Sequence, residues 1–234
     1  MRTLIIAAAL GAACAGALRA QDGAVPNMLS SQEQAEGFRL LFDGTSTRGW
    51  RGWRRATMPE QWQVVDGALT LAARGGGDIV AVDPYGDFEL RLEWKIDPRG
   101  NSGVFFHADE AYERIYTSAP EMQVLDDAGH PDGQNALTSA GANFGLHAAP
   151  RGVVRPAGQW NEARLIVRGA HVEHWLNGQK VVEYEMWSDG WRRLVQASKF
   201  AQWPEYGSAR RGYIGLQDHG DRVAFRSIRI RELR

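Results

Sequence analysis

The chain has 234 residues, a formal net charge of −1 and 44% hydrophobic residues, which is the composition of a globular protein. Such a small net charge argues against a dominant role in binding nucleic acid or a membrane surface. The length suits one sizeable domain with its own core.

Residues 1–20 resemble a secretory signal peptide. A basic residue precedes an apolar segment rich in small residues, and Ala17-Leu18-Arg19-Ala20 offers a cleavage point before Gln21. The segment is too short and too rich in small residues for a membrane-spanning helix. We therefore expect a periplasmic or secreted protein. A lipoprotein anchored at Cys14 is the lesser alternative, because the preceding Leu10-Gly11-Ala12-Ala13 matches a lipoprotein processing site poorly.

The expected mature chain has no cysteine, so its fold depends on the hydrophobic core and not on disulfides. Loss of the two arginines in the signal segment changes the net charge from −1 to −3. The nine tryptophans have two interpretations. Indole rings stack on sugars, but they also fill the cores of β-sandwiches, and composition alone favours the core.

The first patterned elements follow a polar N-terminal extension over residues 21–36. Within it, Ser30 or Ser31 can cap a short helical turn. From Gly37 onward the hydrophobic period is two. Residues 62–71 predict a hairpin that turns at Asp66-Gly67. Residues 88–96 alternate apolar and charged side chains, which predicts the clearest strand of the chain.

The second half of the chain also predicts short strands. Asn177-Gly178 indicates a tight hairpin turn. Residues 126–140 and 186–207 are interpreted as long loops, which are more often functional than idle. No long helical period is evident. We therefore expect an all-β fold, a two-sheet antiparallel β-sandwich, as one domain over residues 37–234. The further strands are expected at 104–107, 121–125, 163–167, 171–176, 180–184, 212–217 and 223–230.

Glu121 is the first candidate for chemistry. Strand alternation places Glu121, Gln123 and Leu125 on one face, with two apolar residues on the other. Glu121 and Gln123 can bind sugar hydroxyls, and Glu121 can also serve as a base or a metal ligand, although a solvated strand face is the simpler interpretation. Sandwich glucanases that retain configuration carry two carboxylates at i and i+4, about 5–5.5 Å apart. Leu125 stands at i+4, so the sequence argues against two-carboxylate hydrolysis on this strand.

The segment Gln217-Asp218-His219-Gly220 joins two predicted strands and combines an amide, an acid and an imidazole. These groups suit hydrogen bonding, proton transfer or metal ligation, but the same residues also form good turns. Alternation directs Gln217 and His219 toward a groove and Asp218 behind it, where its carboxylate can brace the loop.

Two further residues are candidates by position. His174 is expected to face the groove, with Trp175 pointing the opposite way to anchor the core. Lys199 is one of three lysines and lies in the tryptophan-rich segment 186–207. A lone lysine is most often a simple surface residue.

Seven short segments in order resemble the 3-keto-disaccharide hydrolase domain, long described as a domain of unknown function. The resemblance covers roughly residues 37–233 and also includes Leu41-Phe42-Asp43-Gly44 near its start. Each motif alone is weak, and their shared order is specific. Phe144 stands where the family leads us to expect tyrosine, and Ser227 where asparagine is usual. The segments are 101–106 (NSGVFF), 121–126 (EMQVLD), 160–162 (WNE), 174–178 (HWLNG), 198–200 (SKF), 215–220 (GLQDHG) and 225–226 (FR).

The resemblance implies a concanavalin-A-like jelly roll and an enzyme acting on glycosides already oxidised at C3. A ketone at C3 acidifies the C2 proton, so a base can remove it, the C1 substituent can leave, and water can add back. Such a reaction needs a base, an electrophile for the enolate oxygen and an acid. The family also implies a divalent metal as the electrophile.

The resemblance assigns roles to the candidates. Glu121 and His219 are expected to ligate the metal or transfer protons, and His174 is the alternative base. The residues expected to hold sugar hydroxyls or the enolate oxygen are Asn101, Gln123, Gln217, Asp218 and Lys199. Two other functions stay open: a non-catalytic carbohydrate-binding module, and an accessory subunit of a sugar oxidoreductase.

Overall fold

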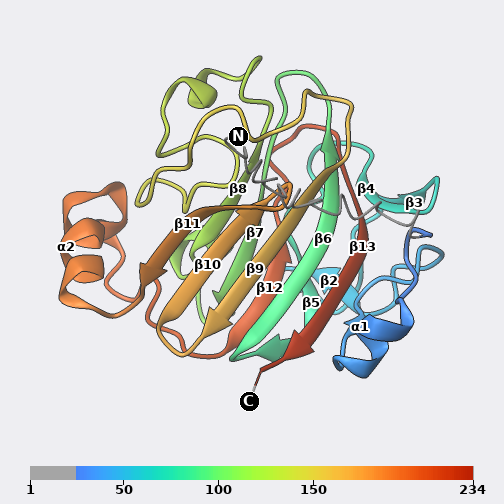
Figure 1. Ribbon diagram of the computed structural model, residues 1–234, viewed down its shortest axis with the longest axis horizontal. Coiled ribbons are helices and arrows are strands. Elements are labelled where there is room, and N and C mark those ends of the chain that lie inside the picture. The colour runs from blue at the N-terminus through green and yellow to red at the C-terminus, as the bar shows by residue number, and fades with distance from the viewer. Residues whose placement is uncertain (1–24, 234) are drawn as a thin grey trace, which may run out of the picture.

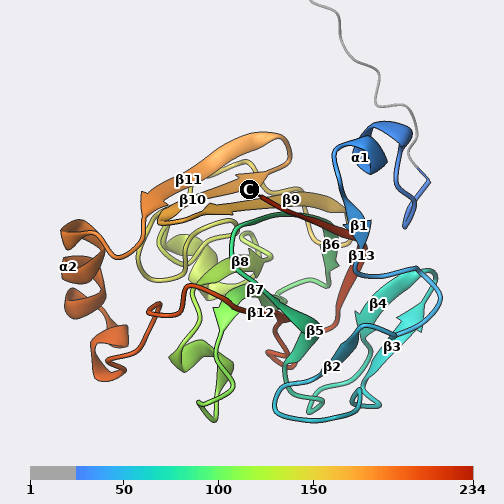
Figure 2. The ribbon, with the colours of Figure 1, turned by 90° about the horizontal axis from the view of Figure 1, so that it is seen from below.

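The structure is a computed structural model that describes residues 25–233, so the expected signal peptide lies outside the described residues. Two antiparallel sheets pack face to face, which confirms the predicted β-sandwich (Figures 1 and 2). The eight-stranded sheet has the order β11-β10-β9-β6-β13-β4-β3, with β1 paired to β13, and the five-stranded sheet has the order β2-β5-β12-β7-β8. None of the described helices is long and apolar enough to cross a bilayer.

The strands are β1 (Arg39–Leu40), β2 (Trp50–Gly52), β3 (Trp62–Val65), β4 (Ala68–Leu71), β5 (Ile79–Tyr85), β6 (Phe88–Ile96), β7 (Asn101–Ala108), β8 (Glu121–Leu125), β9 (Asn161–Arg168), β10 (His171–Leu176), β11 (Gln179–Glu185), β12 (Gly212–Leu216) and β13 (Val223–Glu232). The helices are α1 (Ser31–Ala35) and α2 (Asp189–Ala197), and the 3-10 turns are η1 (Ile115–Thr117), η2 (Pro131–Gln134) and η3 (Lys199–Gln202).

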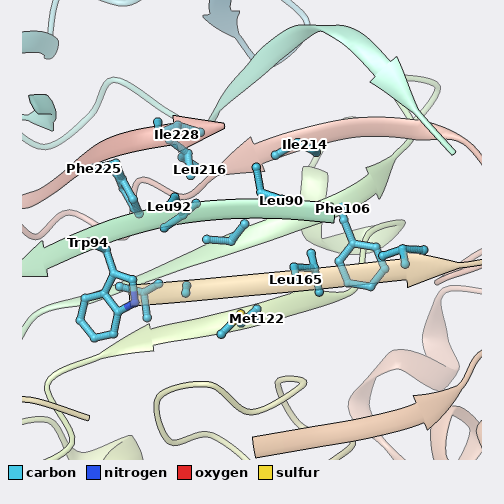
Figure 3. Packing of buried hydrophobic residues seen from close by; sticks show 14 of the residues in the cluster. Leu90, Leu92, Trp94, Phe106, Met122, Leu165, Ile214, Leu216, Phe225 and Ile228 are labelled. Carbon is cyan, nitrogen blue, oxygen red and sulfur yellow. The ribbon is translucent and has the colours of Figure 1, made fainter. Parts of the chain in front are cut away.

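The main core lies between the sheets. Strand β6 contributes Leu90, Leu92 and Trp94, and the opposite sheet contributes Met122 and Ile214 among others (Figure 3). Each of these five side chains is at most 3% exposed. Full burial of one such side chain contributes roughly 1.5–3 kcal/mol before entropy is counted. Period-two alternation therefore accounts for which face of each strand turns inward.

Both predicted hairpin turns are confirmed. Asp66 and Gly67 have φ of 51° and 72°, and Asn177 and Gly178 have φ of 49° and 81°. Two consecutive residues with positive φ form the turn type that matches the twist of antiparallel strands. Asp, Asn and Gly adopt this conformation at low cost, so the sequence specifies these two registers locally.

Several elements differ from the prediction, and the short strands β1 and β2 are among those not expected. Strand β5 was not expected, because an Asp-Pro pair near its end breaks the apolar pattern. Residues 186–207, interpreted as a loop, contain helix α2 and turn η3. The Ser188 side chain caps α2 by accepting from the backbone N–H of Trp191, and Trp191 and Val195 form its buried face. One i, i+4 pair is too little periodicity to indicate a helix by itself.

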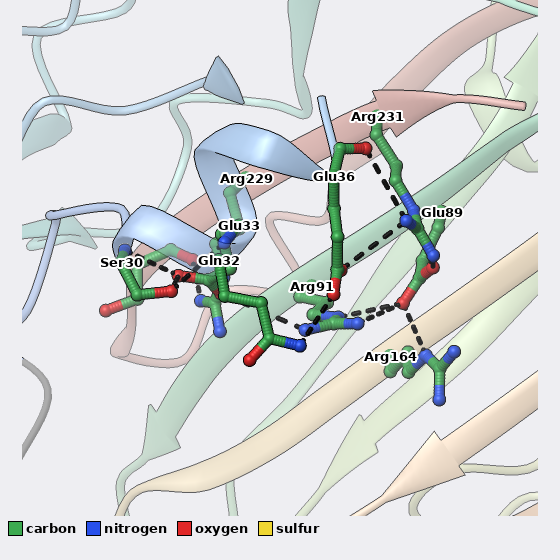
Figure 4. Close-up of polar contacts among 10 residues, drawn as sticks. Ser30, Gln32, Glu33, Glu36, Glu89, Arg91, Arg164, Arg229 and Arg231 are labelled. Carbon is green, nitrogen blue, oxygen red and sulfur yellow. Dashed lines mark hydrogen bonds and ion pairs between the residues drawn. The ribbon is translucent and has the colours of Figure 1, made fainter. Parts of the chain in front are cut away.

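Helix α1 is held to the outer face of the eight-stranded sheet by ion pairs (Figure 4). Ser30 and Glu33 form a capping box at its start, as expected for this segment. Glu36 then pairs with Arg231, and Arg231 Nη2 also lies 2.6 Å from Glu89 Oε2. Glu89 is 1% exposed and has two further guanidinium partners, that of Arg91 on its own strand β6 and that of Arg164 on the neighbouring strand β9. This network fastens the N-terminal segment to the sandwich.

Candidate active site

The candidate site lies on the outer face of the five-stranded sheet, where β12, β7 and β8 run side by side. The register places Gly103 of β7 beside Gln123 of β8, and Gln217 follows β12 and donates its backbone N–H to Gly103 O at 3.0 Å. Met122 and Leu216 point into the core, so their neighbours Gln123 and Gln217 face away from it. Two glutamine side chains thus flank a position that has no side chain.

The Glu121 carboxyl group fills the space above Gly103. A Cβ atom at Gly103 would overlap Oε1 of Glu121, so only glycine permits this side-chain position. Glu121 is 7% exposed and Gln123 is 1% exposed. The simpler interpretation of this strand face, an ordinary solvated surface, is therefore wrong. A polar group buried at this depth costs free energy unless it is paired or serves a ligand.

The pKa of the Glu121 carboxyl is raised to about 8, chiefly because burial disfavours its charged form. Lys199 opposes this shift by attracting the carboxylate, while the negative charge of Asp78 adds to it. No ion pair to Glu121 is formed by any residue between 25 and 233. Near neutral pH the group can therefore exist in both protonation states, which suits an acid–base catalyst.

Asp78 is a functional candidate that the sequence did not reveal. It lies just before β5. Burial and the charge of Asp218 raise its pKa to about 6. A hydrogen bond that its carboxylate accepts from the Asp218 backbone N–H, at 2.9 Å, opposes this shift. Ile79 pairs in register with Leu216, which places Asp78 beside Gln217 at the edge of the site, and the charge of Asp78 adds to the raised pKa of Glu121. The Gly75-Gly76-Gly77 run before it was the only local signal, because β5 itself was not predicted.

Lys199 begins η3 and lies beside the same site. Its Nζ lies 4.2 Å from the centroid of the Phe144 ring and 5.2 Å from that of Phe200. Desolvation lowers the pKa of Lys199, and attraction to Glu121 opposes that shift. Phe144 thus replaces a possible hydroxyl with a cation–π partner for the ammonium group.

The segment that carries Lys199 is anchored by stacked aromatic rings. Phe200 stacks on Tyr206 at 3.9 Å, Tyr206 on Trp191 of α2 at 6.3 Å, and Trp191 on Tyr184 of β11 at 5.5 Å. Among residues 25–233 the buried Tyr206 hydroxyl has no hydrogen-bond partner, and its pKa is raised well above the ordinary value by burial and by the charge of Glu121. Tyr206 is a second site residue that sequence reasoning missed.

Two buried amide oxygens at the site also lack partners. Oε1 of Gln123 and Oε1 of Gln217 accept no hydrogen bond from any residue in the described part of the chain. Gln123 Nε2 donates to Asn101 Oδ1 at 3.4 Å, which orients the amide so that its oxygen is left free. Buried acceptors are rarely left unsatisfied in the presence of their ligand. They suit a ligand that brings O–H donors, such as a sugar.

Asp218 and His219 lie at the edge of this face. Asp218 Oδ2 accepts from the backbone N–H groups of Gly75 and Gly77, and its Oδ1 accepts from that of Gly220, so its carboxylate braces two loops. His219 is exposed, and its ring centroid lies 6.5 Å from that of His130.

The expected orientation of His174 is wrong. His174 shares a strand face with Val172 and Leu176 and is fully buried between the sheets, where its Nδ1 lies 3.0 Å from Gly141 O. Burial lowers its pKa to about 4, which keeps the ring neutral. Trp175 lies on the outer face instead, and its Nε1 donates to Glu173 at 2.6 Å. His174 is therefore a core residue that cannot reach a substrate on the other sheet's outer face.

The expected metal ligands do not form a metal-binding group. Among the described residues, three His, Cys, Asp or Glu donors gather only at His171, Glu173 and Glu183, on the outer face of β10 and β11. The Lys180 ammonium lies 2.6 Å from Glu183 and 3.5 Å from Glu173, where it already neutralises these carboxylates. Within residues 25–233, Glu121 and His219 have no third ligand of this kind, so we derive no chemical step through a metal.

Comparison with known proteins finds a matching family model and a related enzyme that agree with each other. Residues 37–231 match the family model of the 3-keto-alpha-glucoside-1,2-lyase-like domain. The chain is 38% identical to a 3-keto-disaccharide hydrolase of Bacteroides thetaiotaomicron over 231 residues, covering 85% of this chain and 79% of the relative.

Solved structures agree with this result. A putative glycosyl hydrolase from Parabacteroides distasonis superposes with a TM-score of 0.84 at 32% identity, covering 90% of this chain and 100% of the other. A second putative glycosyl hydrolase from the same organism gives 0.66 at 28% identity, covering 84% and 99%. The chain therefore belongs to the family of 3-keto-alpha-glucoside-1,2-lyase-like domains.

Proposed function

We propose that the protein is an exported carbohydrate-active enzyme that cleaves 3-keto-glycosides by elimination across C1 and C2, followed by hydration. The observation that carries the proposal is Glu121, a buried carboxyl with a pKa raised to about 8 and no ion-pair partner among the described residues. The names of the family and of the Bacteroides relative support a glycosidase-like activity of this kind.

Glu121 is the proposed base. Its carboxylate takes the C2 proton, and the electron pair of that C–H bond moves into an enolate whose charge rests on the C3 oxygen. The enolate then collapses and the C1–O bond breaks, with its electron pair leaving on the departing oxygen. The proton held by Glu121 can neutralise this oxygen. Addition of water places a hydroxyl on C1 and a proton on C2, which completes a net hydrolysis.

Lys199 is the proposed electrophile for the enolate oxygen. Its ammonium group is attracted to Glu121 without pairing with it and is steered by Phe144. A fixed positive charge at the site where negative charge develops stabilises the transition state more than the ground state. The unpartnered amide oxygens of Gln123 and Gln217 would orient the ring by accepting hydrogen bonds from its hydroxyls.

A non-catalytic carbohydrate-binding module is the second candidate, and free acceptors such as Gln123 Oε1 suit it equally well. A binding module, however, has no use for a buried carboxyl that is left without a partner at a cost in stability. The raised pKa of Glu121 therefore favours catalysis. An accessory subunit of an oxidoreductase would need only the binding features.

The decisive experiment follows a 3-keto-glucoside in deuterated water by NMR. We expect aglycone release with solvent deuterium at C2 of the sugar product, and we expect Glu121→Gln to slow release by roughly 10²–10⁴-fold. Glu60→Gln, at an exposed position, is the matched charge control. Runs with a chelator and with added divalent ions would show any contribution of a metal. Release without deuterium at C2 would exclude elimination, and an unchanged rate in Glu121→Gln would exclude the proposed base.

A further inference from the structure

A second hollow lies on the outer face of the other sheet, away from Glu121. Its volume is about 280 Å³, and it is lined by the β3–β4 hairpin, the end of β6, the start of β13 and Trp160. Two sequence motifs that the proposed chemistry does not use, Trp160-Asn161-Glu162 and Phe225-Arg226, meet at this place. We propose that this hollow is a separate binding site for a neutral saccharide.

The floor of the hollow is made of small side chains. Ala224 of β13 pairs in register with Thr70 of β4, and Ala68 lies two residues before Thr70. All three point away from the core, yet they are at most 8% exposed, so they lie deep beneath the surrounding side chains. The Thr70 hydroxyl donates to Ala68 O at 3.2 Å, which leaves its own lone pairs able to accept from a ligand.

Cations held against the Trp160 indole form one wall. The Arg226 guanidinium lies 4.1 Å from the ring centroid and the Lys95 ammonium 4.9 Å. Arg226 is also fixed by Glu93, whose Oε2 accepts from Arg226 Nε at 2.8 Å. The Trp160 ring therefore contacts two cationic side chains, and it holds the N–H donors of Arg226 and Lys95 in place. Donors fixed before binding cost less entropy when a ligand arrives.

The charges around the hollow indicate a neutral ligand. Asp66 and Asp97 contribute carboxylates, while Lys95 and Arg222 contribute cations beside the already paired Arg226. Carboxylates would repel an anion and the cations would repel a cation. The hydroxyl groups of a neutral saccharide can donate hydrogen bonds to the carboxylates and accept hydrogen bonds from the cationic side chains, so such a ligand matches both kinds of group. The volume lies at the lower end of small-ligand sites, which suits a single sugar ring.

The test uses the three lysines of the chain, Lys95, Lys180 and Lys199. Reductive methylation with ¹³C-formaldehyde keeps their charge and gives each a methyl signal, assigned with single Lys→Arg variants. Lys95 reports on the hollow, Lys199 on the candidate active site, and Lys180 on bare surface. Titration with glucose and sucrose should move the Lys95 signal saturably, with half-saturation on the order of millimolar, and leave Lys180 unmoved.

Ala224→Leu fills the hollow and should abolish the Lys95 shift, while unchanged Lys180 and Lys199 signals would verify the fold. Ala201→Leu, at an exposed position, is the size control. The proposal is overturned if sugars leave the Lys95 signal unmoved, if Ala224→Leu binds as the parent does, or if acetate moves Lys95 more strongly than sugars do. None of these outcomes depends on the elimination chemistry, because Lys95 and Lys199 are read separately.

Discussion

Two buried glutamates show how the two sheets of this protein use charge. Glu89 lies on the outer face of the eight-stranded sheet, and its carboxylate contacts the guanidinium groups of Arg91, Arg164 and Arg231 (Figure 4). Glu121 lies on the outer face of the five-stranded sheet without an ion-pair partner among the described residues. Burial raises the pKa of both groups, but at Glu89 the arginines outweigh it and the net pKa is lowered.

The difference separates a structural carboxylate from a reactive one. Three guanidinium groups stabilise the ionised form of Glu89 and occupy its oxygens, so this carboxylate has a structural role. Glu121 is held in a position that Gly103 alone permits, and its environment penalises the charged form. Proteins tolerate such an unpaired buried group mainly where function requires it.

Among the variants that leave Glu121 in place, the largest effect is expected at Lys199, the cation that acts on Glu121 from a distance. Lys199→Met should lower kcat by about 10²–10³-fold, because the enolate charge loses its stabilising partner. Removal of the cation should also raise the pKa of Glu121 and move the rising limb of the pH–rate profile to higher pH. Lys180→Met is the matched surface control. A kcat within a factor of two of the parent would remove Lys199 from the mechanism.

At Glu89, the expected effect is on stability. Glu89→Gln leaves three arginines around a neutral amide and should cost about 3 kcal/mol of unfolding free energy in urea titrations. Glu60→Gln should cost almost nothing, because that side chain is exposed. Equal midpoints for parent and Glu89→Gln would show that the arginine cluster does not stabilise the fold.

At Glu121, the corresponding substitution of Glu by Gln should stabilise the folded protein. The folded state binds the Glu121 proton more tightly than the unfolded chain, since its pKa rises from 4.5 to about 8. Stability from this group is thus complete below pH 4.5 and is lost as the pH rises toward 8. Glu121→Gln avoids this loss, so its advantage over the parent should grow across that range, by roughly 4–5 kcal/mol for a shift of this size. Melting temperatures of both proteins at several pH values measure the trend, and a constant difference would contradict it.

The smallest effect is expected at Asp78, whose charge raises the pKa of Glu121. Asp78→Asn should lower the pKa of Glu121 and move the rising limb of the pH profile of kcat/KM to lower pH. This shift should be smaller than the shift to higher pH that Lys199→Met produces. The parent profile should rise through about pH 8 as Glu121 ionises. A shift of the Asp78→Asn limb to higher pH would contradict this electrostatic assignment.

Local sequence was enough for most of the strands. Alternation of apolar and charged residues specifies the strand over residues 88–96. Positive-φ turns specify the two hairpins at Asp66-Gly67 and Asn177-Gly178, because these turns depend on contacts only a few residues apart. Helix α2 escaped detection because only Trp191 and Val195 mark its buried face. The orientation of His174 was mistaken although it shares its face with Val172 and Leu176, a signal that alternation did offer.

Short-range pattern and motif order were enough to predict the β-sandwich, the family and the candidacy of Glu121. The environment of that carboxyl, in contrast, depends on how distant segments pack. Asp78, Lys199 and Tyr206 come from segments far apart along the chain, and their effects on Glu121 depend on the packing of β5, β8 and η3. Burial and Coulomb interactions act through space, so a pKa near 8 cannot be deduced from the order of residues.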